Sequence, residues 1–163
     1  MGVTYVKILC KSLNKIGQTM IYESFSQKDT ENIGYETAQK ASVGQVYCLT
    51  GELGAGKTAF ARGFAKGLGI QENITSPTFS IVNEYNGRLR LFHFDVYRIK
   101  NIQEMEDAGY EEYFYGIGVT LVEWADMITE IWPKDTVVIC IERDILLGDD
   151  FRRISIKPMT KGE

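Results

Sequence analysis

The chain has 163 residues, of which 44% are hydrophobic and 25% charged, and its formal net charge is −4 at pH 7. This length and composition predict a soluble globular protein and exclude a disordered chain. A domain that grips nucleic acid alone usually carries a basic surplus, so we expect any nucleic acid to be held by a partner protein. No uninterrupted apolar run is long enough to span a bilayer, and we therefore expect no membrane association.

Residues 1–19 carry three lysines and no acidic residue. We interpret them as an N-terminal extension of unknown role. The alternatives are a targeting segment, or an upstream start with Met20 as the functional start. Residues 20–163 are expected to form a single domain.

The cysteines give a further indication of the compartment. They are three in number and lack the spacing of a metal site, and Cys48 and Cys140 lie inside apolar runs. A free cysteine in such a run behaves as a small core residue. Reduced thiols without a secretory signal predict a cytoplasmic protein.

The first half of the chain alternates between strand-like and helix-like patterns. Ser26 and Asp29 resemble a capping box that opens a helix, and Gly69 can end a later helix at its C′ position. The expected elements are a strand at 21–25, a helix at 26–41, a buried strand at 45–50 and, after a glycine-rich segment, a helix that reaches Leu68.

The second half combines β-rich and helical segments. Asn86-Gly87 between two β-rich runs predicts a hairpin with a turn of type I′ inside 79–98. The other expected elements are a polar helix at 103–113, buried strands at 119–126 and 136–143, a short helix at 127–132 between them, and an alternating strand at 151–158. This order predicts a three-layer α/β domain with a mixed sheet that is parallel at its centre.

The glycine-rich segment GELGAGKT, residues 51–58, matches the phosphate-binding pattern G-x-x-x-x-G-K-[ST] at every position. Its glycines let the backbone curl so that N–H groups face one point, and the following helix adds a partial positive charge. We expect Lys57 to reach the β- and γ-phosphates and Thr58 to ligate Mg²⁺. The expected nucleotide contacts are Gly51, Glu52, Leu53, Gly54, Ala55, Gly56, Lys57 and Thr58. Residues 20–163 are therefore expected to form a P-loop NTPase-like domain.

A P-loop needs a second acid on the magnesium side, at the end of a neighbouring strand. Glu123 ends the apolar run VTLVE, and Asp95 ends RLRLFHFD. Both carboxylates are expected at the carboxyl edge of the sheet, where ligands of open α/β sheets bind. One would hold Mg²⁺, directly or through water, while the other orients the attacking water.

Three other features have two interpretations each. His93 lies among apolar residues, and we interpret it as a packed or hydrogen-bonded structural residue rather than a catalytic one. Trp124 either lines the nucleotide pocket or packs in the core. The hydroxyls of Thr75, Ser76 and Thr78 lie where many nucleoside triphosphatases keep a switch that senses the γ-phosphate, although a plain turn is the alternative.

The sequence favours ATP as the nucleotide. Guanine specificity usually needs an Asn-Lys-x-Asp segment on a late strand, whereas the only Asn-Lys pair here, Asn14-Lys15, precedes the P-loop and lacks the Asp. A small-molecule kinase normally adds an arginine-bearing lid. We find no insertion large enough for one, although Arg98, Arg152 and Arg153 leave a kinase open.

Several segments together resemble one family, the bacterial TsaE-type ATPases of tRNA threonylcarbamoyladenosine biosynthesis. A P-loop alone is promiscuous, but a P-loop followed in order by Ser-Pro-Thr-Phe, His-Phe-Asp-x-Tyr-Arg and Val-Glu-Trp is specific. The similar segments, which cover most of the chain from Met20, are LTGELGAGKTAFARGFAKGLGI (49–70), ITSPTFSIVNEY (74–85), FHFDVYRI (92–99), EDAGYEEYFYGIGVTLVEWAD (106–126) and RRISI (152–156).

The resemblance implies a mixed α/β ATPase that does not itself modify tRNA. It implies a partnership with the TsaB–TsaD pair, whose TsaD subunit transfers threonylcarbamoyl to the adenosine next to the anticodon, so that tRNA is contacted only indirectly. ATP hydrolysis would sustain repeated rounds of that reaction. By position, the resemblance implies Thr58 and Glu123 as Mg²⁺ ligands and Lys57, Asp95 and Glu123 as catalytic residues.

The resemblance also implies contacts to the base of the nucleotide around Gln27 and Phe151. The family often reads Gly-Arg-Arg before the last strand, whereas this chain reads DDFRR, so that Asp150 and Phe151 depart from the pattern. Two other functions remain open at this point. One is a nucleotide-dependent switch or assembly protein without essential hydrolysis, and the other is a small-molecule kinase.

Overall fold

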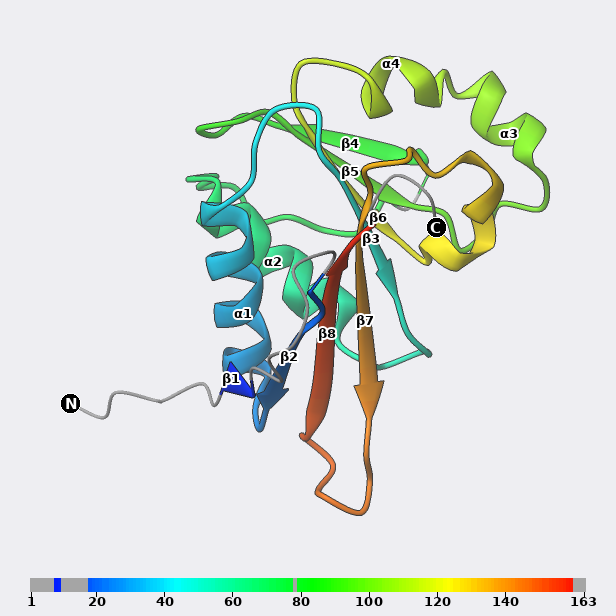
Figure 1. The fold of residues 1–163 in the computed structure, drawn as a ribbon. Coiled ribbons are helices and arrows are strands. Elements are labelled where there is room, and N and C mark those ends of the chain that lie inside the picture. The colour runs from blue at the N-terminus through cyan, green and yellow to red at the C-terminus, as the bar shows by residue number, and fades with distance from the viewer. Residues whose placement is uncertain (1–7, 10–17, 78, 160–163) are drawn as a thin grey trace.

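The computed structural model describes residues 8–9, 18–77 and 79–159. Its centre is an eight-stranded sheet with the order β1-β2-β8-β7-β3-β6-β5-β4 (Figure 1). The strands are β1 (Ile8–Leu9), β2 (Met20–Ser24), β3 (Val46–Thr50), β4 (Val82–Tyr85), β5 (Leu91–Asp95), β6 (Val119–Glu123), β7 (Val137–Arg143) and β8 (Arg152–Pro158). The helices are α1 (Gln27–Gln39), α2 (Lys57–Gly67), α3 (Ile102–Asp107), α4 (Tyr110–Phe114) and the 3₁₀ helix η1 (Ala125–Ile131).

The middle of the sheet is parallel and its edges are antiparallel. Strands β7, β3, β6 and β5 pair in parallel, whereas β4, β8, β2 and β1 join in antiparallel pairs. Strand β6 is buried along its whole length, as expected for a parallel strand covered on both faces. The predicted fold class, a three-layer α/β domain with a mixed and centrally parallel sheet, is confirmed.

The helices form layers on the two faces of the sheet. Helices α1 and α2 cover one face, and α3, α4 and η1 lie on the other side (Figure 1). One apolar cluster joins the first pair to the sheet and includes Ile33, Phe64 and Leu49. The second cluster lies on the opposite face and includes Phe94 and Met105.

Helices α1 and α2 approach each other backbone to backbone. A Cβ atom on Gly63 would lie 1.8 Å from the carbonyl oxygen of Glu31, and one on Gly34 would lie 2.3 Å from that of Phe60. Only glycine fits at these two positions without a shift of one helix. This contact fixes α2, which begins at the P-loop, against α1.

The predicted start of α1 and the predicted end of α2 rest on local signals that the structure confirms. The Ser26 side chain accepts a hydrogen bond from the backbone N–H of Asp29, and the Asp29 carboxylate accepts one from the N–H of Phe25. The first bond satisfies one of the free N–H groups at the start of α1, and the second holds the residue that precedes the N-cap. Gly69, with φ of 78°, follows the C-cap of α2.

The predicted type I′ turn at Asn86-Gly87 is wrong. Tyr85 pairs with Leu91, so residues 86–90 form a five-residue connection, and among the described residues neither central position has the positive φ that this turn requires. Tertiary contacts decide the loop instead. A Cβ on Gly87 would lie 2.4 Å from the carbonyl oxygen of Leu68, and the N–H of Arg88 donates to that oxygen at 2.6 Å.

Two helix predictions also need correction. The single helix expected at 103–113 is two short helices, α3 and α4, because Gly109 adopts φ of 68° between them. The short helix expected at 127–132 begins at Ala125 and is a 3₁₀ helix with a kink at Ile128. Strand β6 accordingly ends at Glu123 rather than at residue 126.

Cys48 and Cys140 are both free thiols, as expected for core cysteines. Cys48 is buried, and this burial raises the pKa of its thiol, whereas Cys140 is partly buried. No helix within residues 8–9, 18–77 and 79–159 is long and apolar enough to cross a membrane. Most of the expected extension at 1–19 lies outside the described residues, so the division at Met20 stays a prediction.

Candidate functional site

The P-loop connects β3 to α2 at the carboxyl edge of the sheet. Gly51, Gly54 and Gly56 have φ values of 141°, 75° and 108°, which side chains with a Cβ rarely adopt. A Cβ on Gly51 would also lie 2.5 Å from the carbonyl oxygen of Ile141. Gly56 is the N-cap of α2 and offers no side-chain cap, so the first N–H groups of this helix are left for a ligand.

Lys57 is held in place by the loop that precedes it. Its Nζ donates to the carbonyl oxygens of Gly51 and Glu52, at 2.6 Å and 2.8 Å, and lies 3.6 Å from the centroid of the Trp124 ring. Burial lowers the pKa of this ammonium group, while the Glu123 carboxylate, the largest opposing influence, raises it. The side chain thus presents a positive charge at the edge of the loop where phosphates would lie.

The Glu123 carboxylate connects three elements. Its Oε2 accepts from the Thr58 hydroxyl at 3.2 Å, and its Oε1 lies 2.8 Å from Nε2 of His93 and 3.5 Å from the Ser76 hydroxyl. The side chain of Glu123 is buried, at 2% relative exposure. A P-loop hydroxyl and a strand-end carboxylate therefore meet as the sequence predicts for a magnesium site.

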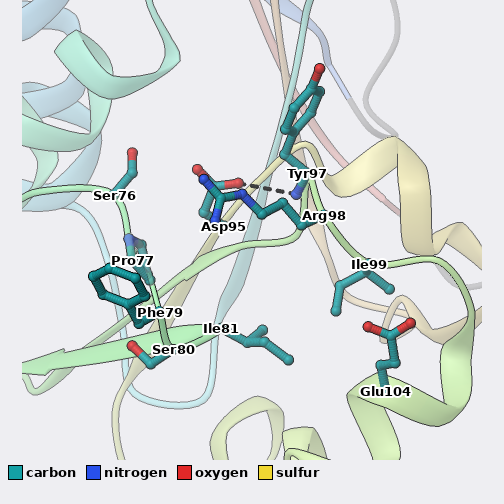
Figure 2. A pocket seen from close by; sticks show the side chains of 10 residues that line it. All are labelled: Ser76, Pro77, Phe79, Ser80, Ile81, Asp95, Tyr97, Arg98, Ile99 and Glu104. Atoms are coloured by element: carbon teal, nitrogen blue, oxygen red, sulfur yellow. Dashed lines mark hydrogen bonds between the residues drawn. The ribbon is translucent and has the colours of Figure 1, made fainter.

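Asp95 lies beside Glu123, because these two residues are register partners at the ends of the parallel strands β5 and β6. The N–H of Tyr97 donates to its Oδ1 at 3.0 Å (Figure 2). Burial raises the pKa of Asp95, and the negative charge of Glu123 raises it further. Ser76, whose hydroxyl lies 3.5 Å from Oε1 of Glu123, lines the same hollow as Asp95, so one residue of the predicted switch segment lies next to both carboxylates.

These residues line a hollow of about 470 Å³, a volume typical of small-molecule sites. Its lining residues are Gln27, Leu53, Gly54, Gly56, Lys57, Thr58, Ala59, Arg62, Ser76, Asp95, Tyr97, Glu123 and Trp124. A second hollow of about 430 Å³ shares Ser76, Asp95 and Tyr97 with it and extends toward Arg98 and Glu104 (Figure 2). Asp95 thus lies where the two hollows meet.

Three residues of the first hollow were missed in the sequence. Arg62 lies one helical turn after Thr58, and that spacing of four residues could have found it. Ala59 shares the first turn of α2, and Tyr97 lies in the segment FHFDVYR. Trp124 lines the hollow and also packs against Tyr97, with ring centroids 4.6 Å apart and the ring planes tilted by 44°.

Arg152, at the start of β8, supports the P-loop from behind. Its Nε donates to the carbonyl oxygen of Ala55 at 2.7 Å, and one terminal nitrogen lies 3.4 Å from that of Gly54. The other terminal nitrogen donates to the carbonyl oxygens of Asp149 and Phe151. A P-loop must turn its N–H groups inward, and Arg152 satisfies carbonyls that this conformation turns outward.

The remaining predicted residues have different positions. Gln27, at the start of α1, lines the hollow. The Phe151 ring is 2% exposed and packs edge-on against Phe25, so it is not offered to this hollow. The N–H of Thr75 donates to the Tyr85 hydroxyl at 3.4 Å, and Thr75 lines neither hollow. Thr78 lies outside the described residues.

The donor set fits Mg²⁺ bound with a nucleotide. The carboxylates of Asp95 and Glu123 and the Thr58 hydroxyl line the hollow together with Lys57 and would supply hard oxygen ligands. In the described part of the chain no three His, Cys, Asp or Glu side chains form a closed metal cage. Mg²⁺ is usually held by one or two carboxylates together with substrate phosphates. Asp95, Glu123 and Thr58 would supply the protein's part of such a set and leave the other positions to the nucleotide.

Comparison with known proteins identifies the family of this chain. The family model described as "Threonylcarbamoyl adenosine biosynthesis protein TsaE" matches residues 24–150. The chain belongs to the TsaE family. It is 48% identical over 135 residues to the tRNA threonylcarbamoyladenosine biosynthesis protein TsaE of Bacillus subtilis, covering 82% of each chain. It is 42% identical to the protein of that name from Treponema pallidum, covering 82% of this chain and 96% of the relative.

A solved structure agrees with this assignment. The crystal structure of YdiB from Bacillus subtilis superposes with a TM-score of 0.71 at 40% sequence identity, covering 90% of this chain and 89% of that one. The TsaE resemblance inferred from the segments between residues 49 and 156 is thereby confirmed. So is the predicted fold class.

Proposed function

We propose that this TsaE-family chain is a Mg²⁺-dependent ATPase that supports threonylcarbamoylation of tRNA in the cytoplasm. The proposal rests on one observation: four side chains with the chemistry of a nucleotide site line the same hollow in a chain of the TsaE family, namely Lys57, Thr58, Asp95 and Glu123. In this proposal the chain acts with TsaB and TsaD. Its net charge of −4 supports a role in which these partners, rather than this chain, hold the tRNA.

The residues have separable roles in the proposed hydrolysis. The N–H groups of the P-loop and the Lys57 ammonium group bind the β- and γ-phosphates and stabilise the charge that develops during phosphoryl transfer. A magnesium ion held by Thr58 and Glu123 would neutralise phosphate charge. Asp95 would orient the attacking water, and its raised pKa supports a role as a group that accepts a proton.

The test is reconstitution with purified TsaB–TsaD and a tRNA substrate. We expect this chain with Mg·ATP to convert single-turnover modification of the tRNA by TsaB–TsaD into multiple-turnover modification. We also expect it to co-purify with TsaB–TsaD. Omission of Mg²⁺ should abolish the effect. A chain that binds Mg·ATP yet neither joins TsaB–TsaD nor restores repeated rounds would refute the role in tRNA modification.

The position of Ser76 beside both carboxylates favours one alternative, a nucleotide-dependent switch. A segment that contacts Glu123 and lines the same hollow as Asp95 can change conformation when the γ-phosphate leaves. Single-turnover hydrolysis by Asp95→Ala and Glu123→Ala variants that still bind ATP separates the two functions. Hydrolysis is essential if these variants fail in repeated rounds, whereas full modification without hydrolysis would establish the switch.

A further inference from the structure

His93 is a fully buried side chain next to the proposed magnesium site, and neither the proposed hydrolysis nor the proposed switch assigns it a role. It lies on β5 two residues before Asp95, so both side chains point to the same face of the sheet. Its relative exposure is 0%, and its Nε2 lies 2.8 Å from Oε1 of Glu123. The parallel register pairs Asp95 with Glu123, which makes His93 the diagonal neighbour of Glu123 on that face.

The two oxygens of Glu123 have different partners. Oε1 meets His93 and, more distantly, the Ser76 hydroxyl at 3.5 Å. Oε2 meets the Thr58 hydroxyl at 3.2 Å. A carboxylate held through one oxygen by a rigid, buried ring cannot rotate freely about its last bond. The contact with His93 therefore determines which oxygen faces the P-loop.

The surroundings of His93 also decide which ring nitrogen carries the hydrogen. Nδ1 is buried and has no hydrogen-bond partner among the residues that the structure describes. A hydrogen on Nδ1 alone would be an unsatisfied buried donor, and the lone pairs of Nε2 and Oε1 would face each other. A hydrogen on Nε2 instead donates to the carboxylate in a charge-assisted bond.

We propose that His93 is a positioning residue for Glu123. Its Nε2–H donates to Oε1 of Glu123. This bond leaves Oε2, which lies beside Thr58, as the oxygen that would bind the magnesium ion. The part of this proposal that concerns magnesium rests on the proposed function, because it requires that Thr58 and Glu123 hold the ion. The hydrogen bond itself is independent of that function and can be measured in the protein without nucleotide.

The hydrogen bond can be tested by nitrogen-15 NMR of the imidazole ring. His93 is the only histidine in the chain, so protein made without a histidine tag gives one pair of ring nitrogen signals that needs no assignment. We expect Nε2 to carry the hydrogen and Nδ1 to have the signal of a bare ring nitrogen. A spectrum in which Nδ1 alone carries the hydrogen would overturn the proposal.

The positioning role can be tested by substitution of the ring. His93→Leu removes the donor, and His93→Gln keeps an amide donor near the position of Nε2. Binding of a fluorescent ATP analogue is measured with Mg²⁺ and with EDTA. We expect His93→Leu to reduce the gain in affinity due to Mg²⁺ by about 10- to 100-fold, the usual effect of losing a hydrogen-bond partner of a metal ligand. Affinity in EDTA should change by less than about twofold, and His93→Gln should restore most of the gain.

The outcomes distinguish this proposal from the proposed function. A wild-type protein whose nucleotide affinity does not respond to Mg²⁺ would refute the magnesium site and the positioning role with it. A wild-type response that His93→Leu leaves unchanged, or an equal loss with Mg²⁺ and with EDTA, would refute the positioning role alone. If His93→Leu fails to fold, the decision rests on the NMR spectrum and on His93→Gln, which must then retain the response to Mg²⁺.

Discussion

The ammonium nitrogen of Lys57 lies 3.6 Å from the centroid of the Trp124 ring, and it also donates to two carbonyl oxygens of the P-loop. Trp124 is the only non-glycine residue with positive φ, 60°, in the part of the chain that the structure describes. A left-handed conformation costs a residue with a Cβ about 1–2 kcal/mol. The turn after β6 thus places an aromatic face against the ammonium group of Lys57.

Trp124 should report nucleotide binding. A phosphate that attracts Lys57 would change the distance between the ammonium group and the ring, and indole emission responds to a nearby cation. The chain has two tryptophans, so Trp132→Phe leaves Trp124 as the sole reporter. We expect a saturable change in emission on adding Mg·ATP. No change while equilibrium dialysis shows bound nucleotide would contradict the proposed movement.

Lys57→Ala should abolish support of tRNA modification. Loss of hydrogen bonds from a charged donor costs about 1.5–3 kcal/mol each, so nucleotide affinity should fall at least about tenfold. The matched control is Lys66→Ala on the same helix. Lys66 is 58% exposed and pairs with Glu31 on the surface, so its loss should leave ATP binding unchanged. Full activity of Lys57→Ala would contradict the phosphate site.

The P-loop and its two acids could be predicted because their chemistry is local in the sequence. The glycines, Lys57 and Thr58 follow one another, and strand-end acids reach a known edge of the sheet. Glu123 and Asp95 meet as register partners because β5 and β6 are adjacent and parallel. The family resemblance rests on the same short segments. The wrong predictions of the turn at 86–87 and of two helices therefore do not affect it.

The rest depended on contacts between distant segments. Arg152 reaches Ala55 across 97 positions of the sequence, and no local pattern marks that contact. The Asn86-Gly87 pair predicts an independent turn, but the hydrogen bond from the N–H of Arg88 to the carbonyl oxygen of Leu68 sets the conformation of this loop. His93 is a buried, hydrogen-bonded side chain, which agrees with its interpretation as a packed or hydrogen-bonded structural residue. Its partner, Glu123, follows only from the adjacent position of β5 and β6 in the sheet, which the sequence does not specify.

Arg152→Ala should weaken nucleotide binding by about tenfold, because one charged hydrogen bond contributes roughly 1.5–3 kcal/mol and part of it stabilises the loop itself. The control is Arg153→Ala on the same strand. Arg153 is exposed, and its guanidinium lies 5.9 Å from the Phe151 ring rather than against the P-loop. Calorimetric titration with Mg·ATP measures both variants. Equal affinity in the two would show that the P-loop does not depend on this support.

Gly63→Ala should destabilise the protein by about 1–3 kcal/mol, the usual cost of overpacking. The added methyl group would lie 1.8 Å from the carbonyl oxygen of Glu31, so α1 or α2 must shift. Thermal and urea unfolding measure the loss. Lys66→Ala, an exposed change on the same helix, should stay within about 1 kcal/mol. An unchanged stability of Gly63→Ala would show that the two helices are not fixed by this contact.

Asp95→Asn should stabilise the protein at neutral pH while it impairs ATP hydrolysis. Burial, aided by the charge of Glu123, raises the pKa of Asp95 above its ordinary value of 3.8. The folded state therefore binds a proton that the unfolded chain has already released, and stability is lost as the pH rises through the folded pKa. The amide that replaces the carboxylate carries no charge to desolvate, so the free energy of unfolding of the Asp95→Asn variant does not fall over this pH range.

The stability difference between Asp95→Asn and the wild type should accordingly be small near pH 4 and grow toward pH 7. Urea unfolding in EDTA, across that range, measures it without metal at the site. Asp135→Asn, at an exposed turn, provides the control for a general change in net charge. A stability gain that is the same at pH 4 and pH 7, or that Asp135→Asn reproduces, would mean that Asp95 is not destabilised by its surroundings. Together with a loss of hydrolysis, the expected profile would mark Asp95 as a carboxylate kept for catalysis at the expense of stability.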